Sequence, residues 1–198
     1  MQAMNRYLEA DLENFKETPI DSTLLYDGTV IHAYRDNVRL PNGRPAFREL
    51  IRHTGAVCVI PITQEEEVIC VRQYRYAVDR LMLEIPAGKL DSKDEDPTDA
   101  VLRELREETG ARCGKLTYLG LYLGSPAIVD EKIYMYLAED LTFGETDPDE
   151  DEFLDTVRIP LSELADLVVA GEIADGKTQA AVLRAERMLH GRPSERKS

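Results

Sequence analysis

One run of apolar residues, 56–62, limits the folds available to this chain more than any other segment. Nearly every residue in it is apolar and several are β-branched, which is typical of a strand buried on both faces of a sheet. Such a strand needs a packed layer on each side. Further strands are predicted at residues 68–74, 81–85, 117–123, 133–138 and 153–159, and helices at 97–109, 161–170 and 178–190. This order predicts an α/β fold in which helices pack on a mixed sheet.

Two turn signals precede this core. Asp27-Gly28 and the segment 41–44 each lie between short apolar runs, an arrangement that predicts β-hairpins. We therefore expect a small antiparallel sheet of about three strands over residues 18–53, after a helical arm at residues 5–16. The predicted domains are an N-terminal arm and sheet subdomain, 1–53, and a main domain, 54–198.

The net charge of the chain limits the classes of partner that it can bind. Among 198 residues, 24 Lys and Arg face 38 Asp and Glu, which gives a net charge of −14. This balance argues against nucleic acid as the main partner, because phosphate binding needs a basic face.

The chain shows no sign of a membrane segment or a signal peptide. No apolar run approaches the roughly 20 residues of a membrane-spanning helix, and residues 1–17 lack the apolar core of a signal peptide. The three widely spaced cysteines are typical of reduced thiols, so we expect a cytoplasmic protein without a membrane partner.

The predicted helix 97–109 has clear signals at both ends. Asp96 is a candidate N-cap, Pro97 suits the first helical position, and Gly110 follows the last turn. An apolar stripe is expected to pack this helix on the sheet; its members are Val101, Leu102 and Leu105.

Three carboxylates gather on the same helix. Glu104, Glu107 and Glu108 stand at i, i+3 and i+4, so they are expected to project from one patch opposite the apolar stripe. Like charges at this spacing destabilise a helix by about a few tenths of a kcal/mol per pair. Arg103 offsets part of this cost, and a divalent cation such as Mg²⁺ would offset it better. Spacing alone does not distinguish such a site from a solvated acidic face.

The surrounding residues add a family resemblance. Segment 88–111, GKLDSKDEDPTDAVLRELREETGA, resembles the Nudix box, G-x5-E-x7-R-E-U-x-E-E-x-G-U with U aliphatic. Six residues instead of five separate Gly88 from Glu95, which lengthens the loop 91–94. The resemblance implies an α/β/α Nudix sandwich with a mixed sheet, preceded by the small N-terminal sheet. The fixed places of the box are taken by Gly88, Glu95, Arg103, Glu104, Leu105, Glu107, Glu108 and Gly110, with Ala111 as the last aliphatic residue.

The flanking segments resemble the ADP-ribose pyrophosphatase branch of that family. Residues 71–75 and 83–89 are similar to its RQYR…LELPAGK run, and the acidic segment 149–153 is similar to its DEDE loop. This resemblance implies Mg²⁺-dependent hydrolysis of ADP-ribose, or of a similar nucleoside diphosphate sugar, to AMP and ribose 5-phosphate. The alternatives are a Nudix pyrophosphatase of other specificity, for GDP-mannose or a dinucleotide, and a non-catalytic ADP-ribose-binding module.

The resemblance also implies a role for each matching carboxylate. Glu104 and Glu108, together with the carbonyl of Ala87, would bind Mg²⁺, with Mn²⁺ as the alternative ion. Glu107 would bridge metals or orient their water. Glu150 is favoured as the general base and Glu152 as a further metal ligand, with the reverse division left open.

Substrate-binding residues follow from the same resemblance. Arg75 and Glu131 match positions that contact the substrate, and Arg48-Glu49 resembles a pair that reaches across from a partner subunit. A homodimer formed through the N-terminal sheet is therefore expected. Tyr26 and Tyr34 are candidates for stacking on adenine, although packing within the sheet explains both equally well.

Overall fold

The computed structural model of the protein describes residues 11–146 and 153–191. They divide into two compact units. One contains the described residues up to His53 together with Ser125–Asp130, and the other contains Thr54–Gly124 together with the described residues from Glu131 onward. No helix within these described ranges combines the length and the apolarity needed to cross a bilayer.

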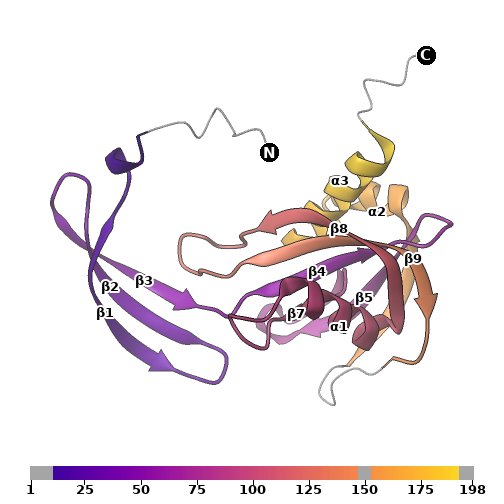
Figure 1. The fold of residues 1–198 in the computed structure, drawn as a ribbon, viewed down its shortest axis with the longest axis horizontal. Coiled ribbons are helices and arrows are strands. Elements are labelled where there is room, and N and C mark those ends of the chain that lie inside the picture. Colours follow the sequence, from indigo (N-terminus) through magenta and orange to yellow (C-terminus); the bar gives the residue numbers. More distant parts are fainter. Residues whose placement is uncertain (1–10, 147–152, 192–198) are drawn as a thin grey trace. The chain divides into compact units, whose positions relative to one another are not determined.

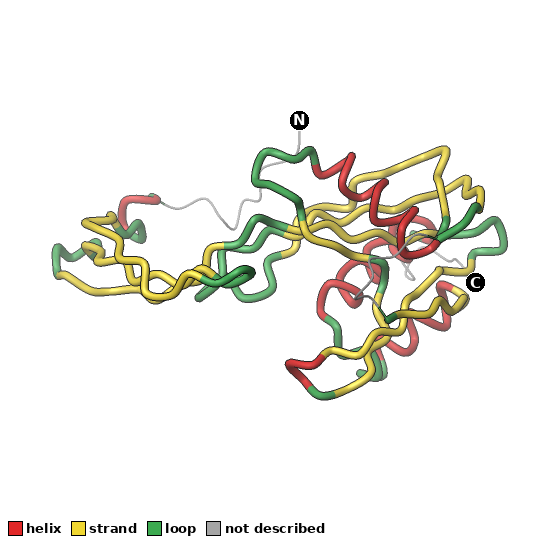
Figure 2. The backbone as a smooth tube through the Cα atoms, turned by 90° about the horizontal axis from the view of Figure 1, so that it is seen from below, coloured by secondary structure: helices red, strands yellow, loops and turns green. Residues whose placement is uncertain are grey.

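The first unit is an antiparallel sheet in the order β1-β2-β3, with bounds β1 Thr18–Asp27, β2 His32–Arg39 and β3 Pro45–Arg52. This confirms the small N-terminal sheet. Segment 125–130 joins it, because Val129 bridges Ile51 and the carboxylate of Asp130 accepts a hydrogen bond from the backbone N–H of His53 at 2.7 Å. Of the predicted helical arm, a 3₁₀ turn at Leu12–Asn14 is present, and residues 5–10 lie outside the described residues (Figure 2).

The second unit contains two sheets. A four-stranded sheet has the order β7-β4-β9-β8, in which β4 runs parallel to β9 and the other pairs are antiparallel. A three-stranded antiparallel sheet has the order β10-β5-β6. The strands are β4 Ala56–Pro61, β5 Glu67–Arg75, β6 Arg80–Glu84, β7 Ala87–Lys89, β8 Ala111–Tyr122, β9 Ile133–Phe143 and β10 Leu154–Pro160.

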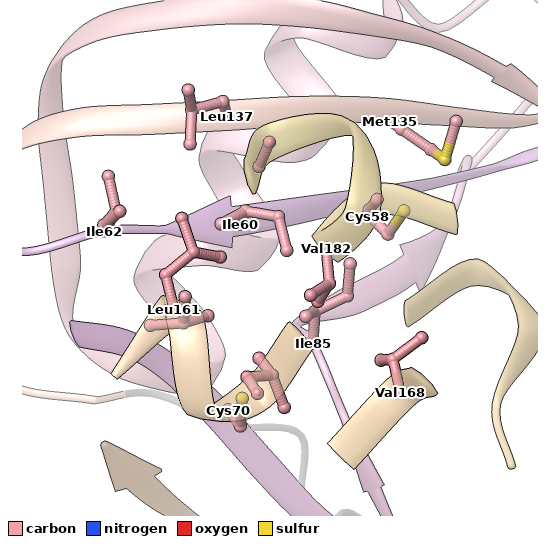
Figure 3. Close-up of a cluster of buried hydrophobic side chains, with 14 of the residues drawn as sticks. Cys58, Ile60, Ile62, Cys70, Ile85, Met135, Leu137, Leu161, Val168 and Val182 are labelled. Atoms are coloured by element: carbon pink, nitrogen blue, oxygen red, sulfur yellow. The ribbon is translucent and has the colours of Figure 1, made fainter. Parts of the chain in front are cut away.

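Strand β4 separates two hydrophobic cores, as the apolar run predicts. Cys58 and Ile60 face a core that includes residues of α2 (Leu161–Val169) and α3 (Gly176–His190), as Figure 3 shows. Val57 and Val59 point the other way and pack with residues of α1 (Pro97–Thr109). The four-stranded sheet therefore has α1 on one face and α2 with α3 beyond the other (Figure 1). This arrangement confirms the mixed α/β sandwich.

Two strands extend beyond the predicted ranges. β8 begins at Ala111 instead of residue 117, and β9 continues to Phe143 instead of residue 138. The two extensions pair with each other, Ala111 opposite Phe143, and Lys115 forms an ion pair with Glu139 at 2.6 Å. The apolar runs do not reach these extensions, because residues 111–116 and 139–143 mix apolar residues with charged residues and a glycine.

Candidate active site

Helix α1 begins and ends where its sequence signals predict. The side chain of Asp96 accepts a hydrogen bond from the N–H of Thr98 at 2.7 Å, and Pro97 occupies the first helical position. Gly110 adopts a left-handed conformation with φ of 68°, and its N–H donates to the carbonyl of Arg106 at 2.8 Å. The observed helix, Pro97–Thr109, therefore has the predicted bounds.

The glutamates of α1 are less exposed than predicted. Glu104 and Glu108 are only 8% and 4% exposed, and Glu107 is half-buried. Ala100 is buried in the core, whereas Leu102 is 40% exposed, so the predicted apolar stripe is wrong at that residue. The pair Glu104 and Glu108 therefore lies on the packed side of the helix and not opposite it.

Gly88 brings the Glu104 carboxylate against the backbone that follows β6. A Cβ on Gly88 would lie 2.0 Å from the carboxyl carbon of Glu104, so only glycine leaves room for this side chain. The short strand β7 holds this glycine, because it pairs Ala87 with Cys58 of β4. The same pairing fixes the position of Ala87, whose neighbour Gly88 lies against the Glu104 carboxylate.

Arg103 connects the glutamates of the helix with the loop that precedes it. Its Nη1 donates to Glu104 at 2.7 Å, its Nη2 to Glu95 at 3.3 Å, and Nη1 lies 3.5 Å from Glu107. Burial by itself would lower the pKa of Arg103, but the charges of Glu104 and Asp91 outweigh it and the pKa is raised. The backbone N–H of Asp91 donates to Glu95 at 2.5 Å. The lengthened loop thus still presents Glu95 to Arg103.

Arg75 belongs to an ion-pair cluster around the buried carboxylate of Glu84. Its Nε and Nη2 donate to the two oxygens of Glu84 at 2.8 and 2.9 Å. Lys177 donates to the same carboxylate and also pairs with Asp175 at 3.1 Å. Burial would raise the pKa of Glu84, yet the hydrogen bond from Arg75 and the charge of Lys177 lower it to about 2.

Sequence reasoning missed Glu84 and Lys177 as members of this site. The signal that could have found Glu84 is a carboxylate at the end of an apolar strand run, where burial of a charge requires a partner. Lys177 carried no such signal, because only the fold brings it to a residue 93 positions earlier.

The remaining predicted substrate residues lie in different places. Arg48 and Glu49 are exposed on β3, where Arg48 pairs with Glu17 and Glu49 pairs with Arg35 at 2.6 Å. Glu131 is half-buried in the segment that leads into β9.

The two predicted aromatic contacts also belong to the first unit. Tyr26 is 61% exposed on β1, and the ring of Tyr34 lies under the guanidinium of Arg52, whose Cζ is 4.6 Å from the ring centroid. Glu150 and Glu152 lie outside the described residues.

The described residues do not by themselves complete a metal centre. Within 11–146 and 153–191, no three His, Cys, Asp or Glu side chains converge closely enough to hold a metal ion. Glu104 and Glu107 instead engage Arg103 and Arg106. The donors that do gather at Gly88, a buried carboxylate and the neighbouring backbone, are nevertheless hard oxygen donors of the kind Mg²⁺ prefers. The residues present therefore fit a divalent cation.

Comparisons with known proteins agree with this geometry. Residues 52–182 match the family described as NUDIX domain. The chain is 39% identical over 173 residues to the ADP-ribose pyrophosphatase of Bacillus subtilis (strain 168), covering 86% of this chain and 93% of the relative. It is 42% identical over 170 residues to the methanol dehydrogenase activator of Bacillus methanolicus, covering 85% and 91%. A crystal structure of an ADP compounds hydrolase superposes with a TM-score of 0.78 at 24% identity, covering 89% of this chain and 95% of the other, and supports the fold alone.

Proposed function

Because the chain belongs to the NUDIX domain family, we propose that it hydrolyses the pyrophosphate bond of ADP-ribose, or of a similar nucleoside diphosphate sugar, in a Mg²⁺-dependent reaction. The observation that carries this proposal is the buried pair Glu104 and Glu108 on α1, with Glu104 seated against Gly88. The similarity to a protein named ADP-ribose pyrophosphatase favours ADP-ribose, whose products would be AMP and ribose 5-phosphate.

The proposed metal-binding residues are Glu104, Glu107, Glu108, Glu152 and the carbonyl of Ala87, with Mn²⁺ as the alternative ion. When bound, the ion neutralises charge on the diphosphate oxygens and lowers the pKa of a bound water. Arg103 holds the Glu104 carboxylate at 2.7 Å from its Nη1 and so limits the orientations of that ligand before any ion is bound.

The proposed proton transfer and substrate contacts use the chain's own side chains. Glu150 takes the proton of the attacking water while the water oxygen bonds to one phosphorus and the bridging P–O bond breaks. Glu107 orients that water. Arg75 contributes to diphosphate binding because its Nη1 takes no part in the pair with Glu84. Glu131 is proposed as a further substrate contact.

We also propose a homodimer formed through the N-terminal sheet subdomain, 1–53. Arg48 and Glu49 of one protomer would contact the substrate bound to the other, which fits their exposed positions on β3. The proposed location is the cytoplasm, where the three free thiols Cys58, Cys70 and Cys113 would stay reduced.

The direct test measures AMP release from ADP-ribose with and without Mg²⁺. Glu108→Gln removes a ligand charge without changing the shape of the side chain, so turnover is expected to fall by about 100-fold or more. Glu163→Gln, an exposed residue of α2, is the matched control and should retain wild-type turnover. Unchanged turnover of the Glu108 variant in a folded protein would overturn the metal assignment. A normal rate for Glu150→Gln beside an inactive Glu152→Gln would reverse the roles proposed for that pair.

Assays on the same purified protein distinguish two alternative functions. Ranking specificity constants for ADP-ribose, GDP-mannose and a dinucleotide identifies a pyrophosphatase of other specificity. Binding of ADP-ribose without AMP release would identify a non-catalytic module.

The similarity to a methanol dehydrogenase activator favours a second candidate function, action on another enzyme. This function is tested by adding the protein to a methanol dehydrogenase and following the rate of that enzyme.

A further inference from the structure

The first turn of α3 carries a lysine whose charge is directed into the site and not into solvent. The Lys177 side chain is only 12% exposed and contacts Glu84 and Asp175. Burial by itself would lower the pKa of this ammonium group, but the charges of Asp175 and Glu84 outweigh burial and raise it. Lys177 is therefore a fixed positive charge inside the cluster that holds Arg75.

The first turn of α3 is itself anchored to the strand that carries Glu84. The Asp175 carboxylate caps the helix by accepting from the N–H of Thr178 at 2.9 Å and from its hydroxyl at 2.5 Å. The Thr178 hydroxyl oxygen in turn accepts the backbone N–H of Ile85 at 3.0 Å. Because Ile85 follows Glu84 directly, these bonds keep Lys177 in register with the carboxylate that it contacts.

The charges in the cluster balance only when Lys177 is present. Two carboxylates, Glu84 and Asp175, face two cations, Arg75 and Lys177. Arg75 is also within electrostatic reach of Asp175 and of Glu108. Without Lys177, a single guanidinium would serve both the buried Glu84 and the half-buried Asp175, and it would be drawn toward Asp175 and away from its place near Glu108.

We propose that Lys177 is a positioning residue for pyrophosphate hydrolysis, and that through Glu84 it holds Arg75 where its Nη1 can bind the diphosphate. The proposal rests on the proposed function, because it takes Arg75 as a substrate-binding residue. Lys177 itself need not touch the substrate.

The first experiment is a double-mutant cycle on kcat/KM for ADP-ribose. Lys177→Met, which keeps the length of the side chain and removes its charge, is expected to lower kcat/KM by about tenfold or more. In an Arg75→Ala background the same substitution is expected to have no further effect, because the residue through which Lys177 acts is already gone. Lys115→Met, on the exposed side of β8, is the matched control and should behave as wild type.

The second experiment does not depend on activity. The ¹⁵N–¹H NMR signal of the Arg75 Nε–H group, assigned with Arg75→Lys, reports the bond to Glu84, and Lys177→Met is expected to shift it. If the wild-type protein releases no AMP from ADP-ribose, the proposed function fails while this signal still tests the positioning. Should the Met variant not fold, Lys177→Gln serves in both experiments.

Three results would overturn the proposal. One is a Lys177 variant whose kcat/KM stays within about twofold of wild type, which corresponds to less than about 0.5 kcal/mol. Another is an equal loss in the Arg75→Ala background. The last is an Arg75 signal that does not change when Lys177 is replaced.

Discussion

Replacing Gly88 by alanine tests the geometry of the proposed metal site with a single methyl group. The new Cβ would lie 2.0 Å from the carboxyl carbon and from Oε1 of Glu104, and 2.3 Å from Oε2. Real Cβ atoms essentially never come within 3.0 Å of another heavy atom, so the carboxylate must retreat by at least 3.0 − 2.0 = 1.0 Å. The methyl group therefore displaces one proposed ligand and leaves the chemistry of every other group unchanged.

The expected effects on activity and on stability differ. A misplacement of about 1 Å costs about 100-fold in rate, so kcat/KM should fall by about that factor, or about 2.7 kcal/mol of transition-state stabilisation. The displaced group is the end of a side chain, and Gly88 does not have the positive φ that disfavours alanine. The free energy of unfolding is therefore expected to stay within about 1 kcal/mol of wild type.

The assay combines AMP release, Mg²⁺ binding by calorimetry and urea unfolding of the same preparation. Gly144→Ala is the matched control, because its nearest neighbour outside the adjacent residues, the carbonyl oxygen of Gly110, lies 3.8 Å from the new Cβ. A Gly88→Ala protein with wild-type kcat/KM would refute the link between Gly88 and the Glu104 ligand. Loss of folding would refute the reasoning that the side chain alone absorbs the clash.

The remaining predictions concern stability. Thr178→Val removes the hydroxyl oxygen that accepts the buried N–H of Ile85, so the free energy of unfolding should fall by about 1–3 kcal/mol in urea melts at neutral pH. A loss under about 0.5 kcal/mol would contradict this hydrogen bond. Because the pKa of Glu84 falls from 4.5 to about 2 on folding, its ionised form stabilises the protein above pH 4.5, and this contribution is lost as the pH falls toward 2. Glu84→Gln should therefore show a shallower decline of unfolding free energy over that range, and equal slopes for both proteins would count against the shift.

The sequence predicted the fold where local signals and burial agree. The α1 boundaries followed from Asp96, Pro97 and Gly110, whose capping chemistry is local. The burial of β4 followed from its apolar run, and the hairpins from their turn residues. The extensions of β8 and β9 were not predicted, because they lack a continuous apolar run and are joined to each other by backbone pairing.

The candidate site was predictable only in part. Spacing placed Glu104, Glu107 and Glu108 on one helix, but it did not show that Glu104 and Glu108 are buried. Burial depends on elements that fold against the helix, such as β7, whose Gly88 lies against Glu104. The link from Arg75 through Glu84 to Lys177 is a property of the folded chain, since its members come from β5, β6 and α3. The roles of Glu150 and Glu152 stay predictions.

The contact between Glu84 and Lys177 joins residues that are synthesised at different stages of translation. A ribosome makes the glutamates of α1 long before it reaches residue 177, and 93 positions separate the lysine from its carboxylate partner. A nascent or truncated chain that ends before α3 thus holds every residue of the box but leaves Glu84 with one cation instead of two. The ion pair between Glu84 and Lys177 can therefore form only after the start of α3 has been synthesised.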